Sequence, residues 1–179
     1  MVVRNRISVE QYLSLPEGEK PYLEFANGDV IAKAMPNMDH GVLVQAFGLR
    51  LGAYARDHGG RCGPEIRVEF VTTAGPVFRL PDFSYWAAGR PRRGDRAAQP
   101  PTLAIEVVSP DDTLAEQREK CAFYVDNGID EAWLVNPATR TVERFGDRSR
   151  LLRGSASLAS EALPGFELSL SELFAVLDE

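Results

Sequence analysis

The sequence predicts an α/β domain in which a mixed β-sheet is flanked by helices. Three observations predict it. Residues 41–56 have helical periodicity, residues 103–108 form an apolar run typical of a strand buried on both faces, and a helix separates that run from the next strand. Mixed element order with one β-α-β crossover favours a mixed sheet. The length of 179 residues is ordinary for one domain, so we expect a single domain over residues 1–179.

The N-terminal part is expected to form a short helix and then a hairpin that extends the sheet. The helix begins at Ser8 and ends before a segment that contains proline and glycine. The hairpin turns at Asn27-Gly28, because asparagine and glycine both tolerate positive φ, and its strands are residues 22–25 and 30–34.

A longer helix and two strands are expected next. Asp39 is the expected N-cap of a helix over about residues 41–56, in which Val42, Ala46, Leu49 and Ala53 form an apolar stripe. Alternating apolar and charged residues then indicate a half-buried strand at 66–70. After a Gly-Pro turn, a second strand is expected from Phe78 to Trp86.

The second half of the chain contains the crossover. After the strand at 103–108, Thr113 and Glu116 match a capping box and begin a helix, which an Asn-Gly pair ends. Two more strands are expected at 131–135 and 141–145, and a short helix is expected in the tail.

Composition narrows the class of protein. A formal net charge of −6 counts against strong non-specific binding of nucleic acid, although it leaves room for a local basic patch beside a bound cation. No apolar run approaches the roughly 18 residues of a membrane span, so no membrane association is expected. Cys62 and Cys121 are far apart and in no metal-binding motif, which favours a reducing cytoplasm over a disulfide framework or a zinc site.

Two acidic residues stand where acids are unusual. Glu106 is the one polar residue between Leu103 and Val108, and a buried carboxylate must be compensated by a cationic side chain, a proton or a metal ion. A buried ion pair is therefore one reading. Asp82 follows Pro81, where an aspartate is commonly a turn or cap residue. If their strands pair, however, the two carboxylates can meet, and two acids with water suit Mg²⁺ or Mn²⁺.

Lys120 can reach the same place. The strand runs about 10 Å from Glu106 to its end at roughly 3.3 Å per residue, and the helix returns about 10 Å from Thr113 to Lys120 at roughly 1.5 Å per residue. A helix folded back along its strand therefore puts Lys120 level with Glu106. The alternative is an exposed i,i+4 pair between Glu116 and Lys120.

Other polar residues are open to two readings. Glu24 and His40 could join the acidic site or serve as surface and capping groups. The arginines of the loop at 87–101 could contact phosphates or could simply be solvated; they are Arg90, Arg92, Arg93 and Arg96. Trp86 and Trp133 fall within strand patterns and are expected in the core.

The ordered segments over residues 8–145 resemble a known family. They read YLEFANGDV, MDHG, RLPDFSYW, PTLAIEVVSPDD and REKCAFYVDNGIDEAWLVNP. This pattern is similar to that of the Uma-two family of endonucleases in the PD-(D/E)xK superfamily. The resemblance implies a restriction-endonuclease-like fold and Mg²⁺-dependent hydrolysis of phosphodiester bonds in nucleic acid, with DNA favoured. It also implies that Asp82 and Glu106 are the metal ligands.

One position departs from the superfamily motif. Val108 stands where the lysine two residues after the acid is usual, and the resemblance implies that Lys120 replaces it. Glu24 and His40 match positions that recur in the family, Glu24 as a further catalytic candidate. A homodimer is expected, because two-fold pairing is common and cutting a duplex needs two sites. Two alternatives stay open: a catalytically silent nuclease-fold module for binding or assembly, and a structural domain with a Glu106–Lys120 pair.

Overall fold

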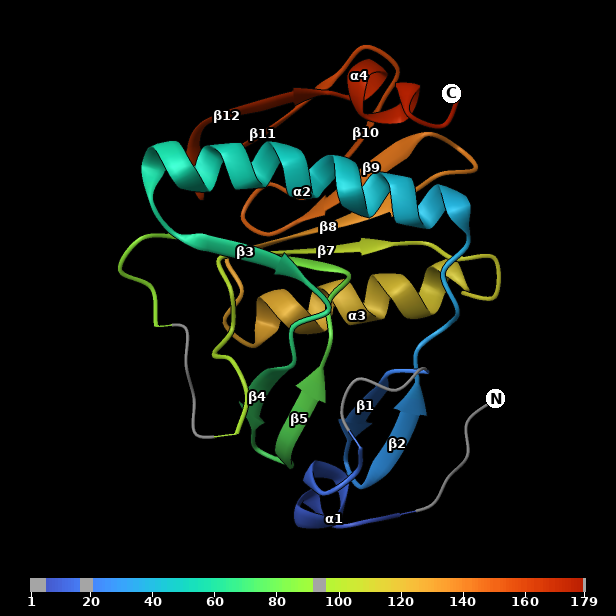
Figure 1. Ribbon diagram of the computed structural model, residues 1–179, viewed down its shortest axis with the longest axis vertical. Coiled ribbons are helices and arrows are strands. Elements are labelled where there is room, and N and C mark those ends of the chain that lie inside the picture. The colour runs from blue at the N-terminus through green and yellow to red at the C-terminus, as the bar shows by residue number, and fades with distance from the viewer. Residues whose placement is uncertain (1–5, 17–20, 92–95, 179) are drawn as a thin grey trace.

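The computed structural model describes residues 6–16, 21–91 and 96–178, and its centre is a six-stranded sheet (Figure 1). The strand order is β10-β9-β8-β7-β6-β3. In chain order these strands are β3 (Arg61–Pro64), β6 (Phe83–Trp86), β7 (Leu103–Val107), β8 (Glu131–Asn136), β9 (Thr141–Phe145) and β10 (Arg150–Arg153). The pair β7–β8 is parallel and its neighbours pair antiparallel, so the expected mixed sheet with one crossover is confirmed.

Two helices cover the two faces of this sheet (Figure 1). Helix α2 (Met38–His58) packs its apolar side chains with the β6 and β7 residues Phe83 and Ile105, and helix α3 (Leu114–Asp126) packs on the opposite face. The expected crossover helix and its Thr113 N-cap are confirmed.

Two predictions for α2 are wrong. The N-cap is Asn37, whose side chain accepts a hydrogen bond from the His40 amide at 2.9 Å, and Asp39 lies in the first turn. The buried stripe is Leu43, Phe47, Leu51 and Tyr54, whereas Leu49 is 70% exposed. The bulkier apolar side chains therefore face the sheet, because they bury more apolar area than the expected stripe of smaller residues.

A second, antiparallel sheet lies beside the first, with strand order β2-β1-β5-β4. Its strands are β1 (Leu23–Ala26), β2 (Asp29–Ala32), β4 (Val68–Thr72) and β5 (Gly75–Arg79). The predicted hairpin is confirmed as β1–β2, and Asn27 has the positive φ of 54° that the turn requires. Helix α1 (Val9–Leu13), capped by Ser8, packs Tyr12 against Phe25 and Phe78 of this sheet.

The prediction of one strand from Phe78 to Trp86 is wrong, because the chain changes sheets there. Strand β5 ends at Arg79 in the four-stranded sheet, and β6 begins at Phe83 in the six-stranded sheet. Pro81 lies between them, and proline has no N–H to continue a ladder. Asp82 therefore lies at the junction of the two sheets, immediately before β6.

The tail contains more β-structure than predicted. Strands β11 (Ser157–Ser160) and β12 (Leu163–Ser169) form a two-stranded sheet, and the expected terminal helix is α4 (Leu170–Ala175). Their apolar residues complete the core on the α2 side. Both cysteines are free, and among the described residues no helix combines the length and apolar character that crossing a membrane requires.

Candidate active site

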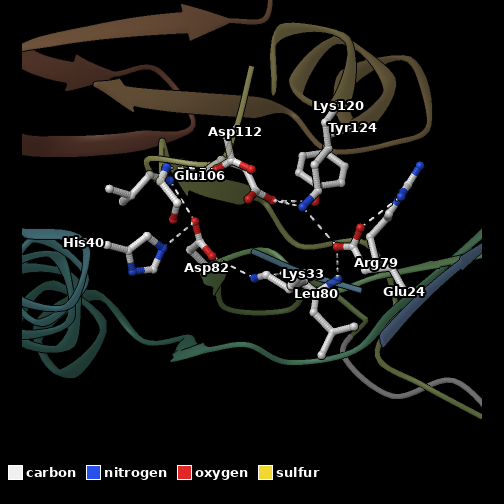
Figure 2. A network of polar contacts seen from close by, with 12 residues as sticks. Glu24, Lys33, His40, Arg79, Leu80, Asp82, Glu106, Asp112, Lys120 and Tyr124 are labelled. Carbon is white, nitrogen blue, oxygen red and sulfur yellow. Dashed lines mark hydrogen bonds and ion pairs between the residues drawn. The ribbon is translucent and has the colours of Figure 1, made fainter. Parts of the chain in front are cut away.

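Five elements bring charged side chains together where the two sheets meet (Figure 2). Asp82 precedes β6 and Glu106 lies in β7, which pairs antiparallel with β6. Glu24 comes from β1, His40 from the first turn of α2, and Lys120 from α3. All five sequence-predicted site residues therefore lie in one network of polar contacts.

Asp82 is buried and held by three donors. The backbone N–H of Val107 donates to Oδ2 at 2.8 Å, and Nε2 of His40 lies 3.1 Å from the same oxygen. The ammonium group of Lys33 donates to Oδ1 at 2.7 Å. Burial raises the pKa of Asp82, but the Lys33 charge and the His40 contact outweigh it and hold the pKa well below its usual range. Asp82 is therefore ionised.

Glu106 is buried in the middle of the apolar strand with two partners. The Tyr124 hydroxyl donates to its Oε1 at 2.6 Å, and Nζ of Lys120 lies 3.1 Å from that oxygen. Burial raises the pKa of Glu106 to about 7; Lys120 opposes the rise and Asp82 adds to it. The carboxyl group therefore has less cationic compensation than its burial requires.

Lys120 connects Glu106 to Glu24. Its Nζ lies 3.0 Å from Glu24 Oε1, and its side chain is only 13% exposed, so it is not the alternative exposed partner of Glu116. Burial lowers the pKa of Lys120, but Glu106, Glu24 and Asp82 outweigh this and raise the pKa above its usual value. The lysine is therefore a fixed positive charge beside both carboxylates.

Glu24 is fixed in turn by the strand that leads to the junction. The Leu80 amide donates to Oε1 and Nη1 of Arg79 donates to Oε2, both at 2.9 Å. Burial raises the pKa of Glu24, but Lys120, Arg79 and Lys33 bring it down to about 2. Glu24 thus acts as a permanent anion that holds Lys120.

Sequence reasoning missed Lys33. It follows β2, and its Nζ donates to the Leu80 carbonyl and to Asp82 Oδ1, both at 2.7 Å. A lysine directly after a short strand is usually a surface residue, and nothing in the local pattern distinguishes this one. It is buried because the hairpin packs against the junction at residues 80–82, which no spacing within the hairpin reveals.

The chemistry of the donors fits a hard divalent cation. The described residues contain no group of three or more His, Cys, Asp or Glu side chains arranged to hold a metal. Mg²⁺ nevertheless usually binds through one or two carboxylates and keeps several waters. Asp82, directly before β6, and Glu106, in the strand β7 that pairs with β6, supply two carboxylates. Asp82 is already paired with Lys33, so a metal would have to share or replace that contact.

The remaining candidates lie outside this network. Arg90 pairs with Asp130 at 2.7 Å and Arg96 pairs with Glu69, whereas Arg92 and Arg93 lie outside the described residues. The expectation that both tryptophans belong to the core is confirmed, since Trp86 and Trp133 are 3% and 0% exposed.

Comparisons with known proteins agree with the fold and with the motif order. A family described as "Uma2: Putative restriction endonuclease" matches residues 9–171. An uncharacterized protein of Synechocystis sp. is 24% identical over 139 residues, which are 75% of this chain and 70% of that protein. The crystal structure of a "putative nuclease belonging to DUF820" from Anabaena variabilis has a TM-score of 0.82 at 22% identity, covering 96% of this chain and 99% of that one.

Proposed function

The chain belongs to the Uma2 family of restriction-endonuclease-like proteins, as its motifs predict, and on that premise we propose that it is a metal-dependent nuclease. The reaction is hydrolysis of phosphodiester bonds in nucleic acid, with DNA as the expected substrate. The observation that carries the proposal is the pair of buried carboxylates Asp82, immediately before β6, and Glu106, in the neighbouring strand β7, with the ammonium group of Lys120 beside Glu106.

Asp82 and Glu106 are the proposed ligands of Mg²⁺ or Mn²⁺. When bound, such an ion polarises a phosphoryl oxygen and lowers the pKa of a coordinated water. The raised pKa of Glu106 supports this assignment, because it indicates a buried carboxyl group that lacks sufficient positive charge nearby.

The surrounding residues fix the geometry of these groups. The Tyr124 hydroxyl donates a hydrogen bond to Glu106 Oε1 and so orients that carboxylate. Glu24 holds the Lys120 ammonium group, whose Nζ lies 3.0 Å from Glu24 Oε1 and 3.1 Å from Glu106 Oε1. Lys120 would donate to the attacking water or to the phosphoryl oxygens as negative charge develops on them. Glu24 is thus a positioning residue in this mechanism.

The substrate and assembly belong to the same proposal. A net charge of −6 means that contacts with phosphates must come from local cations rather than from the surface as a whole. Cutting both strands of a duplex needs two sites, and a two-fold homodimer is the simplest assembly that supplies them.

One observation favours a second function, that of a catalytically silent binding or assembly module. The three carboxylates of the network, Glu24, Asp82 and Glu106, are matched by three cationic side chains, Lys33, Arg79 and Lys120. Val108 also stands at the usual lysine position. A network that is neutral without a metal can stabilise the fold with no chemistry to perform.

Cleavage assays with matched variants separate the two functions. Supercoiled plasmid, single-stranded DNA and RNA are incubated with Mg²⁺ or Mn²⁺ and with wild type, Asp82→Asn, Glu106→Gln or Glu131→Gln. Glu131 is another buried carboxylate, in β8, and it pairs with Arg144 rather than with a residue of the network. We expect cleavage by wild type and Glu131→Gln, and none by the other two. Equal rates in all four, or no cleavage by folded wild type, would refute the nuclease function.

A further inference from the structure

Lys33 is an ammonium group placed against a proposed metal ligand. Its Nζ donates to Asp82 Oδ1 and to the Leu80 carbonyl, and its side chain is 11% exposed (Figure 2). The other oxygen of Asp82 accepts from the Val107 amide and lies beside His40. Oδ1 is therefore the oxygen whose contact comes from a flexible side chain rather than from the backbone or an adjoining ring.

We propose that Lys33 is a built-in competitor for the metal: its ammonium group occupies the cation position at Asp82 Oδ1 and must swing out before a divalent ion can bind. This inference rests on the proposed function, since it takes Asp82 as a metal ligand. It assigns a role to a residue that no sequence motif singles out.

The ammonium group and a divalent ion cannot both occupy the position at Asp82 Oδ1. Nζ of Lys33 lies 2.7 Å from this oxygen, so an ion that binds there meets a cationic side chain at contact distance. Two positive charges a few ångströms apart repel strongly in a buried site. Rotation of the flexible four-carbon side chain of Lys33 relieves that repulsion.

Neutral substitutions at Lys33 should strengthen metal binding while weakening the metal-free fold. Lys33→Met and Lys33→Gln remove the charge, and the glutamine variant keeps a donor for the Leu80 carbonyl. Because a neighbouring charge typically changes an ionic equilibrium by one to three powers of ten, we expect the Kd for Mn²⁺ to fall by about tenfold or more. Without metal, Asp82 loses its principal counter-charge, so the melting temperature should fall.

Arg79→Gln is the matched control. It also removes a buried cation from the network, but Arg79 pairs with Glu24 and not with Asp82. A lysine that only stabilised the fold would behave like Arg79, so its loss would lower the melting temperature whether or not metal is present. A competing lysine predicts instead that saturating Mn²⁺ raises the melting temperature more in the Lys33 variants than in wild type or Arg79→Gln.

The experiment measures free Mn²⁺ by electron paramagnetic resonance during titration, together with melting temperatures at zero and saturating Mn²⁺. Tighter binding in the Lys33 variants, abolished by adding Asp82→Asn, supports the inference. If Lys33 variants that do not fold without metal refold when Mn²⁺ is added, that also supports it, whereas failure to refold opposes it.

The two possible failures are distinguishable. If wild type binds Mn²⁺, Glu106→Gln abolishes the binding, and the Lys33 variants bind no more tightly, then the metal site stands and the role of Lys33 is refuted. If neither wild type nor the Lys33 variants bind Mn²⁺, or if Glu106→Gln binds as wild type does, the metal site itself is refuted and the inference falls with it.

Discussion

Replacing Glu106 by glutamine should remove a loss of stability that the wild type shows as the pH rises. In the fold the pKa of Glu106 is about 7, against 4.5 for an ordinary glutamate. Between these values the folded chain keeps a proton that the unfolded chain has released. Stability rises with pH only where the unfolded state binds more protons, so the Glu106 contribution must fall across this window and level off above it.

The size of the fall follows from the two pKa values. A difference from 4.5 to about 7 corresponds to about 3 kcal/mol, and the group is fully buried, so solvent screening does not reduce it. Glu24 acts in the opposite sense: its pKa is lowered to about 2, so its contribution is complete above pH 4.5 and is lost as the pH falls towards 2. The wild type should therefore be most stable near pH 5.

Urea unfolding of wild type and Glu106→Gln from pH 4.5 to pH 8, with a metal chelator in the buffer, measures this pH dependence of stability. Glutamine has the shape of the protonated acid and still accepts a hydrogen bond from Tyr124. The free energy of unfolding of Glu106→Gln should therefore not decrease over this pH range. The difference in unfolding free energy between wild type and variant at each pH isolates the contribution of Glu106. Saturating Mg²⁺ should flatten the wild-type curve, because the metal binds the ionised form. Parallel curves for wild type and Glu106→Gln without metal would refute the reasoning.

Two further predictions follow from local contacts. Tyr124→Phe removes the 2.6 Å hydrogen bond to Glu106 Oε1, so it should cost about 1.5–3 kcal/mol of folding stability and reduce cleavage; unchanged unfolding and kcat would show that the hydroxyl does not orient the carboxylate. Asn37→Ala removes the N-cap of α2 and should lower the folding stability by about 1 kcal/mol, whereas Asp39→Ala should lower it less. Thermal melting of both variants measures this difference, and a larger loss for Asp39→Ala would show that Asp39 is the cap.

The sequence contains enough to bring the central acids together. A glutamate inside an apolar strand requires compensation wherever the strand lies, and the rise per residue of strand and helix places Lys120 level with it. Those arguments use local geometry alone, and the structure brings Lys120 to 3.1 Å from Glu106. The place of Asp82 depends on one condition, that its segment pairs with the Glu106 strand, and β6 does pair with β7.

Other features depend on contacts distant in sequence and could not be read from local patterns. Lys33 and Glu24 reach the site only because the β1 strand pairs with β5, and this pairing joins segments about fifty residues apart. Strand β3 contains glycine and proline, residues that are poor in strands, and its pairing with β6 overrides that preference. The break between β5 and β6 reflects the packing of two sheets, and an apolar pattern alone does not mark it.

The residues of the site come from two separate stretches of the chain. Glu106, Lys120 and Tyr124 belong to one strand-helix-strand unit, β7-α3-β8, whereas Glu24, Lys33 and Asp82 all precede it. During synthesis, Glu24, Lys33 and Asp82 leave the ribosome before Glu106, Lys120 and Tyr124. A nascent chain that has not yet released β7 therefore carries Asp82 with its partner Lys33, but only one of the two carboxylates proposed to bind the metal.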